Sequence, residues 1–373
     1  MRFDLVLIGF GNVGRRFARL ANELAPALRR EHDVESRIIG ICTRSHGQIF
    51  RPRGVDAVTL AEFVEAGRPI GSNGSAPAFL RRVLDTCATT ARDRRLVMVE
   101  TTTLDIDSGQ PAIGHVRTAL RGGAHVITSN KGPAAFAYRT LGAAANRARR
   151  CFLFESAVMD GVPIFNLAKA ALPGTIVTGF RGVINSTTQY MLTAMEQGDT
   201  FEQALQAMQR AGIAEADPRL DVDGWDAAAK TAILANVLLD GRLTPRTVAR
   251  QGLGSTVGDR ARAARAIGRR LKLVASAERT SSGVHGDVQL VELPETDLLG
   301  GLENQQNALV LKTDVLGEIG IVQRGSGLTQ TAYGLVADLV AIEREVRRNL
   351  SRRRPALRVR ARRNRARRAR RRS

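Results

Sequence analysis

The chain has 373 residues, 43% of them hydrophobic, and a formal net charge of +20, and this length suffices for two domains with proper cores. No apolar run reaches the ~18 residues that cross a membrane, and the N-terminus opens directly into a predicted strand. The three cysteines lack the spacing of a metal site or a disulfide framework, so we expect a cytoplasmic protein without membrane association.

The N-terminal segment has the pattern strand, glycine loop, helix. An apolar run over residues 3–8 is followed by Gly9-Phe10-Gly11-Asn12-Val13-Gly14. In such a loop the first glycine allows the tight turn, the second lets a pyrophosphate approach the backbone, and the third allows close helix–strand packing. The phosphates then lie at the positive end of the helix. We expect these six residues to bind a dinucleotide; the alternative is a glycine-rich turn without a ligand.

Arg44 follows the second predicted strand, residues 36–42, where the cofactor ribose is usually recognised. NAD sites usually carry Asp or Glu there, to hold the ribose 2′-hydroxyl. An arginine flanked by hydroxyls suits a 2′-phosphate instead, so the sequence favours NADP, with NAD as the alternative. Arg44 as a solvated charge at a strand end is the other interpretation.

Two further predicted strands end in polar residues. Residues 96–103 run into Thr101 and Thr102, and residues 125–133 run into Ser129 and Lys131. Each end would lie at the carboxyl edge of a parallel sheet, where open α/β folds bind ligands. Only five of the 56 basic side chains are lysines, which favours special roles for those lysines, because arginine cannot shift its pKa as an ammonium can.

An acidic loop precedes a helix, residues 231–239, that is apolar almost all round and therefore buried. Lys230 is the only formal charge between Asp226 and Asp240. A lysine there needs a carboxylate or a ligand, because an unpaired buried charge is costly. A purely structural Asp226–Lys230 pair on one helix face is the alternative to a catalytic lysine.

These motifs resemble the homoserine dehydrogenase family over roughly residues 1–345. The family pattern Gly-x-x-Glu-x-Asp-Pro-x-x-Asp-aliphatic-x-Gly-x-Asp-x-x-x-Lys is matched by Gly212, Glu215, Asp217, Pro218, Asp221, Val222, Gly224, Asp226 and Lys230. Two mild departures are Met208, where the family usually has alanine, and the segment Asn185-Ser186-Thr187-Thr188-Gln189, where it more often has Asn-Gly-Thr-Thr-Asn.

The resemblance implies reversible, NADP-preferring reduction of L-aspartate 4-semialdehyde to L-homoserine, in the biosynthesis of threonine, methionine and isoleucine. Lys230 would donate the proton, Lys131 would be a second cation between nicotinamide and substrate, and Asp226 would orient the centre. Glu215 and Asp221 would bind the substrate ammonium. A developing alkoxide needs a proton and a nearby positive charge, which ammonium groups supply.

The resemblance also implies a homodimer and a sodium ion. The ion would be held by the Glu155 carboxylate and by the carbonyls of Val158, Asp160 and Val162, since oxygen ligands suit such a cation. Without the resemblance, a helix-entry turn with Glu155 paired to an arginine would be preferred.

We expect an α/β protein of two domains. Residues 1–133 would form a Rossmann-type, doubly wound parallel sheet, and residues 134–319 an α+β substrate and dimerisation domain. Residues 320–346, with a glycine turn at Gly327 and a following helix, would return to the first domain and close over the cofactor. Longer family members add an aspartate kinase or a regulatory domain; we expect a short, monofunctional enzyme without them.

Residues 347–373 contain fifteen arginines and no acidic residue, a composition that predicts disorder. One interpretation is that the arginines of this tail bind the phosphates of a nucleic acid. The other, which the composition favours, is that the tail is a dispensable extension. Two alternatives remain for the whole chain: another NAD(P)-dependent amino-acid dehydrogenase, or a non-catalytic nucleotide sensor that binds nucleic acid through the tail. The retained Lys131, Asp226 and Lys230 favour the enzyme.

Overall fold

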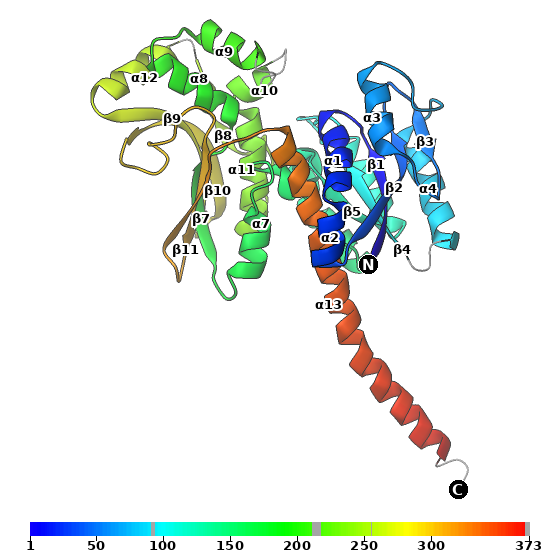
Figure 1. Ribbon diagram of the computed structural model, residues 1–373. Coiled ribbons are helices and arrows are strands. Elements are labelled where there is room, and N and C mark those ends of the chain that lie inside the picture. Colours follow the sequence, from blue (N-terminus) through cyan, green and yellow to red (C-terminus); the bar gives the residue numbers. More distant parts are fainter. Residues whose placement is uncertain (91–93, 211–217, 255, 370–373) are drawn as a thin grey trace.

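The chain folds around two six-stranded sheets. The computed structural model describes residues 1–90, 94–210, 218–254 and 256–369. The first sheet has the strand order β3-β2-β1-β4-β5-β6, and the second has the order β12-β11-β7-β9-β10-β8. Helices α11 and α13 run between the two sheets (Figure 1). No helix of the described residues is long and apolar enough to span a membrane.

The first sheet is parallel except at one edge, where β3 runs antiparallel to β2. Its central strands are buried apolar runs, as expected for strands covered by helices on both faces. The strands are β1 (Arg2–Ile8), β2 (Glu35–Cys42), β3 (Gln48–Phe50), β4 (Arg94–Glu100), β5 (His125–Thr128) and β6 (Phe152–Leu153). The helices are α1 (Asn12–Glu23), α2 (Ala25–His32), α3 (Ala57–Glu65), α4 (Ala76–Thr90), α5 (Ala112–Arg121) and α6 (Lys131–Ala148). The predicted Rossmann-type arrangement is therefore present.

The first sheet extends past the boundary predicted at residue 133. Strand β6 pairs in parallel with β5, through Val126–Phe152 and Ile127–Leu153. The prediction stopped too early because β6 has only two residues, too few for a pattern of alternating or continuous apolar residues to be recognised.

The second sheet is antiparallel except for β8, which pairs in parallel with β10. Its strands are β7 (Val177–Val183), β8 (Ala249–Arg250), β9 (Arg269–Thr280), β10 (Gly283–Pro294), β11 (Asn307–Thr313) and β12 (Glu318–Gln323). The helical segments are η1 (Glu155–Ala157), α7 (Ile164–Asn166), η2 (Leu167–Ala171), α8 (Ser186–Glu196), α9 (Phe201–Arg210), α10 (Arg219–Val222), α11 (Trp225–Leu238) and α12 (Val257–Ala266). Strand β12 belongs to this sheet, so the return to the first domain starts only after it.

Helix α13 (Leu328–Ala369) makes that return. Its first part packs on α1 and on the first sheet and buries one stripe of side chains: Ala332, Leu335, Val336, Leu339, Val340, Ile342 and Val346. Arg16 of α1 donates from Nε to the Thr329 hydroxyl across 3.0 Å. The helix start therefore lies beside the helix that follows the glycine loop.

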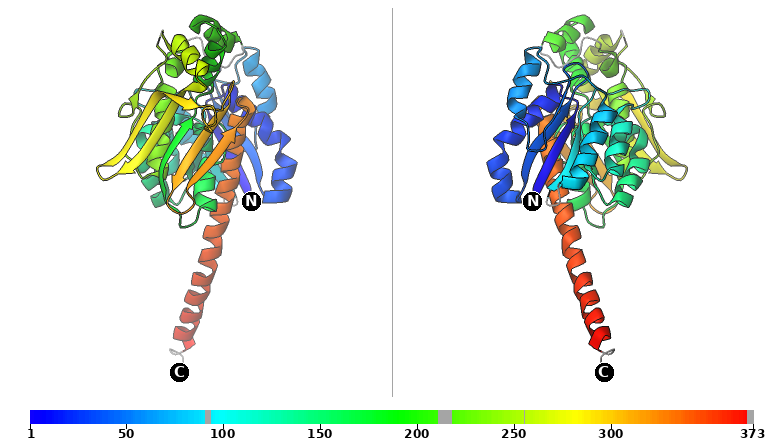
Figure 2. Two further views of the ribbon diagram at one scale, coloured as in Figure 1. Left: turned by 90° about the vertical axis from the view of Figure 1, so that its left-hand side faces the viewer. Right: turned by 90° about the vertical axis from the view of Figure 1, so that its right-hand side faces the viewer.

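The sequence predicts disorder for residues 347–373, and the structure differs from this prediction over residues 347–369. Helix α13 continues to Ala369 and projects from the body, as both views of Figure 2 show. The packed first part supplies the costly helical nucleus, so further residues extend the helix at a low free-energy cost. Arginine and alanine, which dominate this stretch, are both good helix formers.

Candidate active site

Two lysines from different domains meet at one carboxylate. Lys131 is the first residue of α6, Asp226 lies in the first turn of α11, and Lys230 lies one turn further on. The Nζ atom of Lys131 is 3.1 Å from Asp226 Oδ1, and the Nζ atom of Lys230 is 2.8 Å from Asp226 Oδ2. The Lys131 and Lys230 side chains keep 24% and 14% of their surface exposed, so a substrate can reach both.

The segment after β7 supplies the remaining contacts. Lys230 Nζ donates to the carbonyl oxygen of Ile184 across 2.7 Å. The amide Nδ2 of Asn185 donates to Asp221 Oδ1 and to Asp226 Oδ2, both at 2.8 Å. Asp221 thus stands beside the lysine pair, as its predicted substrate role requires. The other predicted ammonium ligand, Glu215, lies outside the described residues.

The charged groups of this cluster shift one another's pKa values. Burial raises the pKa of the Asp226 carboxyl, but the ammonium groups of Lys131 and Lys230 outweigh burial and hold the pKa below its usual value. The Asp226 charge outweighs burial at Lys131 and raises the pKa of that ammonium. Burial, followed by the charge of Asp226, raises the pKa of Asp221. Lys131 therefore remains a cation across the physiological range.

The glycine loop has the geometry that a dinucleotide needs. Gly9 has a φ of +91°, and a Cβ there would lie 2.6 Å from the Thr101 carbonyl carbon. A Cβ on Gly14 would lie 2.9 Å from the Thr101 hydroxyl, whereas a Cβ on Gly11 would meet nothing within 4 Å. Gly9 and Gly14 thus allow close internal packing, and Gly11, at the N-terminus of α1, faces open space where a pyrophosphate would approach.

The other loop residues contribute mainly through the backbone. The Phe10 side chain is buried in the core of the first domain, and Val13 packs against the same core. Arg15, which the sequence did not single out, fixes the loop: it donates to the Phe10 carbonyl across 3.1 Å and to Asn12 Oδ1 across 2.7 Å.

Arg44 stands at the end of β2 in a compact turn. The turn is closed by hydrogen bonds from the Thr43 amide and hydroxyl to the Gly47 carbonyl, at 3.0 and 2.9 Å. Arg44 and Ser45 are exposed there. Within the part of the chain that the structure describes, the Arg44 side chain has no ion-pair or hydrogen-bond partner. It is therefore available to a bound anion.

A buried carboxylate, Glu100, organises the ends of β4 and β5. Its side chain accepts hydrogen bonds from the hydroxyl of Thr102 and, at 3.1 Å, from that of Thr128. Its carbonyl oxygen accepts from the Ser129 amide at 3.2 Å. The predicted cofactor residues Thr102 and Ser129 thus lie together at the carboxyl edge of the sheet.

The predicted sodium loop is compact but already rich in hydrogen bonds. The Glu155 carboxylate accepts from the Phe165 amide at 2.7 Å and from the Asn166 amide at 3.0 Å, and the Val162 carbonyl accepts from the Ile164 amide at 2.8 Å. Among residues 1–90, 94–210, 218–254 and 256–369, no group of three His, Cys, Asp or Glu residues could hold a metal. The two remaining ligands of the predicted set are the carbonyls of Val158 and Asp160.

The Asp160 side chain connects this loop to the start of α13. Its Oδ2 accepts from Gln323 Nε2 at 3.0 Å and from the Gly327 amide at 3.4 Å, and its Oδ1 accepts from the Thr331 hydroxyl at 2.8 Å. The predicted glycine turn is therefore fixed to the loop that follows the first domain.

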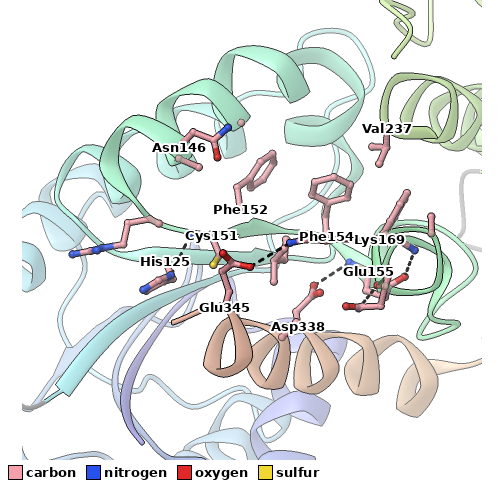
Figure 3. A pocket seen from close by; sticks show the side chains of 18 of the residues that line it. His125, Asn146, Cys151, Phe152, Phe154, Glu155, Lys169, Val237, Asp338 and Glu345 are labelled. Carbon is pink, nitrogen blue, oxygen red and sulfur yellow. Dashed lines mark hydrogen bonds and ion pairs between the residues drawn. The ribbon is translucent and has the colours of Figure 1, made fainter. Parts of the chain in front are cut away.

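A groove of about 1280 Å³ lies apart from the lysine pair. Figure 3 shows side chains that line it. It runs along β6 between the second half of α6 and α13, and neither Lys131 nor Lys230 lines it. Phe154 is at its centre, with ring centroids 5.1 Å from both Phe152 and Phe165. Charges of both signs surround the rings: Arg150, Lys169, Arg348, Glu155, Asp338 and Glu345.

A dinucleotide-binding sheet facing a second domain that supplies a paired lysine and carboxylates defines the class of an NAD(P)-dependent oxidoreductase. Comparison with known proteins agrees with this class. Residues 163–340 match the model of the homoserine dehydrogenase family. The chain is 34% identical over 349 residues to an NAD(+)-dependent homoserine dehydrogenase of Pseudomonas canavaninivorans, covering 93% of this chain and 97% of the relative.

Other relatives agree. The chain is 31% identical to a homoserine dehydrogenase of Methanocaldococcus jannaschii, with 91% of this chain and 98% of the relative covered. A crystal structure of a homoserine dehydrogenase from Thiobacillus denitrificans has a TM-score of 0.77 at 27% identity, over 92% of this chain and 74% of that one. This chain belongs to the homoserine dehydrogenase family.

Sequence reasoning missed Asn185 as a residue of the site. Its segment was noticed only for the serine that follows it. The local signal is that of a helix N-cap, because Asn185 Oδ1 accepts from the Thr188 amide at 2.8 Å. That signal gives no information on where the amide nitrogen points, since Asp221 and Asp226 are distant in sequence.

Proposed function

We propose that this chain catalyses the reversible reduction of L-aspartate 4-semialdehyde to L-homoserine. The observation that carries the proposal is the convergence of Lys131, Asp226 and Lys230, with Asp221 beside them. The two ammonium groups offer positive charge and a proton to an aldehyde oxygen, and the carboxylates offer a place for an α-ammonium group.

The two lysines take different roles. Asp226 raises the pKa of Lys131, which makes it a poor proton donor and a good fixed charge beside the developing alkoxide. Lys230 donates the proton in reduction and accepts it in oxidation, while Asp226 and the Ile184 carbonyl hold its ammonium in place. Asp221 and Glu215 bind the substrate ammonium.

The cofactor, when bound, supplies or accepts the hydride. The residues that would hold it are Gly9, Phe10, Gly11, Asn12, Val13, Gly14, Arg44, Thr101, Thr102, Ser129, Lys131 and Gly327. We propose a preference for NADP, because Arg44, at the end of β2, is exposed and unpaired among the described residues, and residues 43–47 include no acidic residue. The named NAD(+) dependence of the Pseudomonas relative makes NAD the competing cofactor.

We further propose a cytoplasmic homodimer in which the groove along β6 forms the interface. Strand β6 is the edge of the first sheet, so it has a free side to which a second strand can add. The groove combines aromatic rings with charges of both signs, and a two-fold interface must be complementary to itself. Size-exclusion chromatography with light scattering measures the oligomeric state; Ile176→Glu, at an exposed residue that lines the groove, should yield monomers.

We also propose a sodium ion at the loop formed by residues 155–162. Glu155 and Val162 already accept hydrogen bonds, which leaves the carbonyls of Val158 and Asp160 as the unengaged ligands of the predicted set. We expect replacement of Na⁺ by a bulky organic cation at constant ionic strength to lower thermal stability. An unchanged melting temperature would contradict the binding of a sodium ion at this loop.

The decisive experiment is a spectrophotometric assay of homoserine oxidation, with NADP and NAD in parallel. We expect activity with both cofactors and a higher kcat/KM with NADP. Absence of homoserine oxidation by folded protein, with turnover of another amino alcohol or hydroxy amino acid, would assign a different dehydrogenase activity.

A further inference from the structure

Asn185 joins the two carboxylates of the site through one amide group. Its Nδ2 lies 2.8 Å from Asp221 Oδ1 and 2.8 Å from Asp226 Oδ2, and the residue is only 5% exposed. An amide nitrogen carries two hydrogens, so each carboxylate receives one. Both hydrogens are thereby used, and the nitrogen has no donor left for another group.

The opposite side of the amide fixes its orientation. Asn185 Oδ1 accepts from the Thr188 amide at 2.8 Å and from the Thr188 hydroxyl at 2.9 Å. Turning the amide over would point its oxygen at two carboxylates and its nitrogen at an N–H donor. The network therefore permits one orientation, and the N-cap of α8 holds the donor rigidly between the acids.

We infer that Asn185 is a positioning residue that keeps Asp221 and Asp226 close together, with both available as anions for the substrate ammonium and for the lysine pair. The inference rests on the roles proposed above for those two carboxylates. Like charges this close repel, and the shared neutral donor adds to the two lysine ammonium groups in keeping both carboxylates ionised. The Ile184 carbonyl accepts a hydrogen bond from Lys230. Residues 184 and 185 together therefore hold Lys230, Asp221 and Asp226 in position.

The pKa shifts agree with this arrangement. Burial and the Asp226 charge raise the pKa of Asp221, while the hydrogen bond from Asn185 lowers it. The other charged groups that face Asp221 are Lys230 on α11 and, behind Asp226, Lys131 on α6. Arg219 belongs to the same short helix as Asp221, and Asp223 is the residue that caps the end of that helix. Removing the donor must therefore raise the pKa of Asp221.

Two substitutions separate positioning from capping. Asn185→Ser retains an N-cap side chain for α8 but cannot reach both carboxylates, and serine caps about as well as asparagine. Asn185→Asp also retains the cap but puts a third carboxylate where the donor was. Asp56→Ser, at the exposed N-cap of α3, is the matched control for a change of capping residue far from the site.

The measurement is the pH profile of kcat/KM for homoserine, together with the melting temperature of each variant. We expect Asn185→Ser to lower kcat/KM roughly ten- to hundredfold, the effect of losing one hydrogen bond to a charged group, and to move the acidic limb to higher pH. Asn185→Asp should move the limb further in the same direction, and Asp56→Ser should leave it unchanged.

A loss of activity with an unmoved acidic limb, in step with a lower melting temperature, would reduce Asn185 to a helix cap and overturn the inference. The same result follows if Asn185→Asp matches the wild-type profile. Failure of the wild type to oxidise homoserine would instead overturn the proposed function, so the two outcomes are distinct.

Discussion

Lys230 is the residue on which the proposed chemistry depends most. We expect Lys230→Ala to lower kcat about 10²–10⁴-fold, the usual contribution of a positioned proton donor. The affinity for NADP(H) should change little, because the glycine loop that would hold the phosphates is on the other domain. Lys230→Arg should not restore activity, since a guanidinium stays protonated and has a different shape. Steady-state kinetics and fluorescence titration with NADPH measure both quantities.

Lys312 is the matched control, because it is an exposed lysine on β11 that is distant from Lys131 and Lys230 in sequence and has no role in the proposed mechanism. Lys312→Ala should retain wild-type kcat. If Lys230→Ala also retained it, Lys230 would be a structural partner of Asp226, and Lys131 would be the remaining candidate for the proton donor.

Arg44 provides a test of cofactor choice. We expect Arg44→Asp to weaken NADP use by about 1.5–3 kcal/mol, the value of a hydrogen bond to a charged group, and to improve NAD use. Arg51→Asp makes the same change of charge at another exposed arginine of the first domain and should leave the preference unaltered. The measurement is the ratio of kcat/KM with NADP to kcat/KM with NAD. The same ratio in the wild type and in Arg44→Asp would contradict a role of Arg44 in cofactor choice.

At the residue scale, the sequence predicted the charged members of the site but not what holds them. Lys230 could be predicted because it is a lone charge on an apolar helix. The loop from Gly9 to Gly14 could be predicted because its glycine spacing allows a tight turn, the approach of a pyrophosphate and close helix–strand packing. Asn185 and Glu100 were missed because their importance lies in contacts between segments far apart in the chain. Glu215 falls outside the described residues, so its placement stays a prediction.

At the element scale, strand β9 carries a lysine that is fully buried. Lys272 Nζ donates to the Leu302 carbonyl at 2.5 Å and to Gln189 Oε1 at 3.3 Å, and burial lowers its pKa from 10.5 to about 8. Between these two pH values the unfolded chain binds a proton that the folded chain has released. The free energy of unfolding must then rise with pH across this window, by roughly 3 kcal/mol in total.

Lys272→Met removes the titrating group while retaining most of its volume. Urea unfolding of both proteins at about pH 8 and about pH 10.5 measures the effect. We expect wild type to gain stability relative to Lys272→Met as the pH rises. If the free energies of unfolding of the two proteins changed in parallel with pH, the pKa of Lys272 would not be lowered in the folded protein.

Elements were predictable to the extent that they are long and periodic. Strand β1, helix α1 and the buried helix α11 were expected from their apolar patterns, and the structure has each of them. The two-residue strand β6 offered no such pattern. The helical extension of α13 was missed because charge density alone was taken to predict disorder, whereas a packed helical nucleus precedes it.

At the scale of the whole molecule, the arginine-rich extension is separable from the enzyme. The buried stripe of α13 ends at Val346, and the proposed site residues all precede it. A chain ending at Asn349 should therefore keep its fold and kcat but lose salt-sensitive retention on heparin or DNA, because phosphate contacts release counterions. The full-length protein in high salt is the control. An insoluble or inactive shortened chain would show that the extension belongs to the folded unit.

The packing of α13 has a consequence for how the protein is made. Phe3, Leu5 and Phe17 share one core with Leu335 and Leu339, so the core of the first domain can close only after the second domain and the start of α13 have been synthesised. Such contacts between distant parts of a chain are slow to form, and the waiting strands expose apolar surface throughout synthesis of the second domain. The nucleotide domain of this protein thus completes its core after the second domain has been made, and its yield in the cell should depend on chaperones more than that of the second domain.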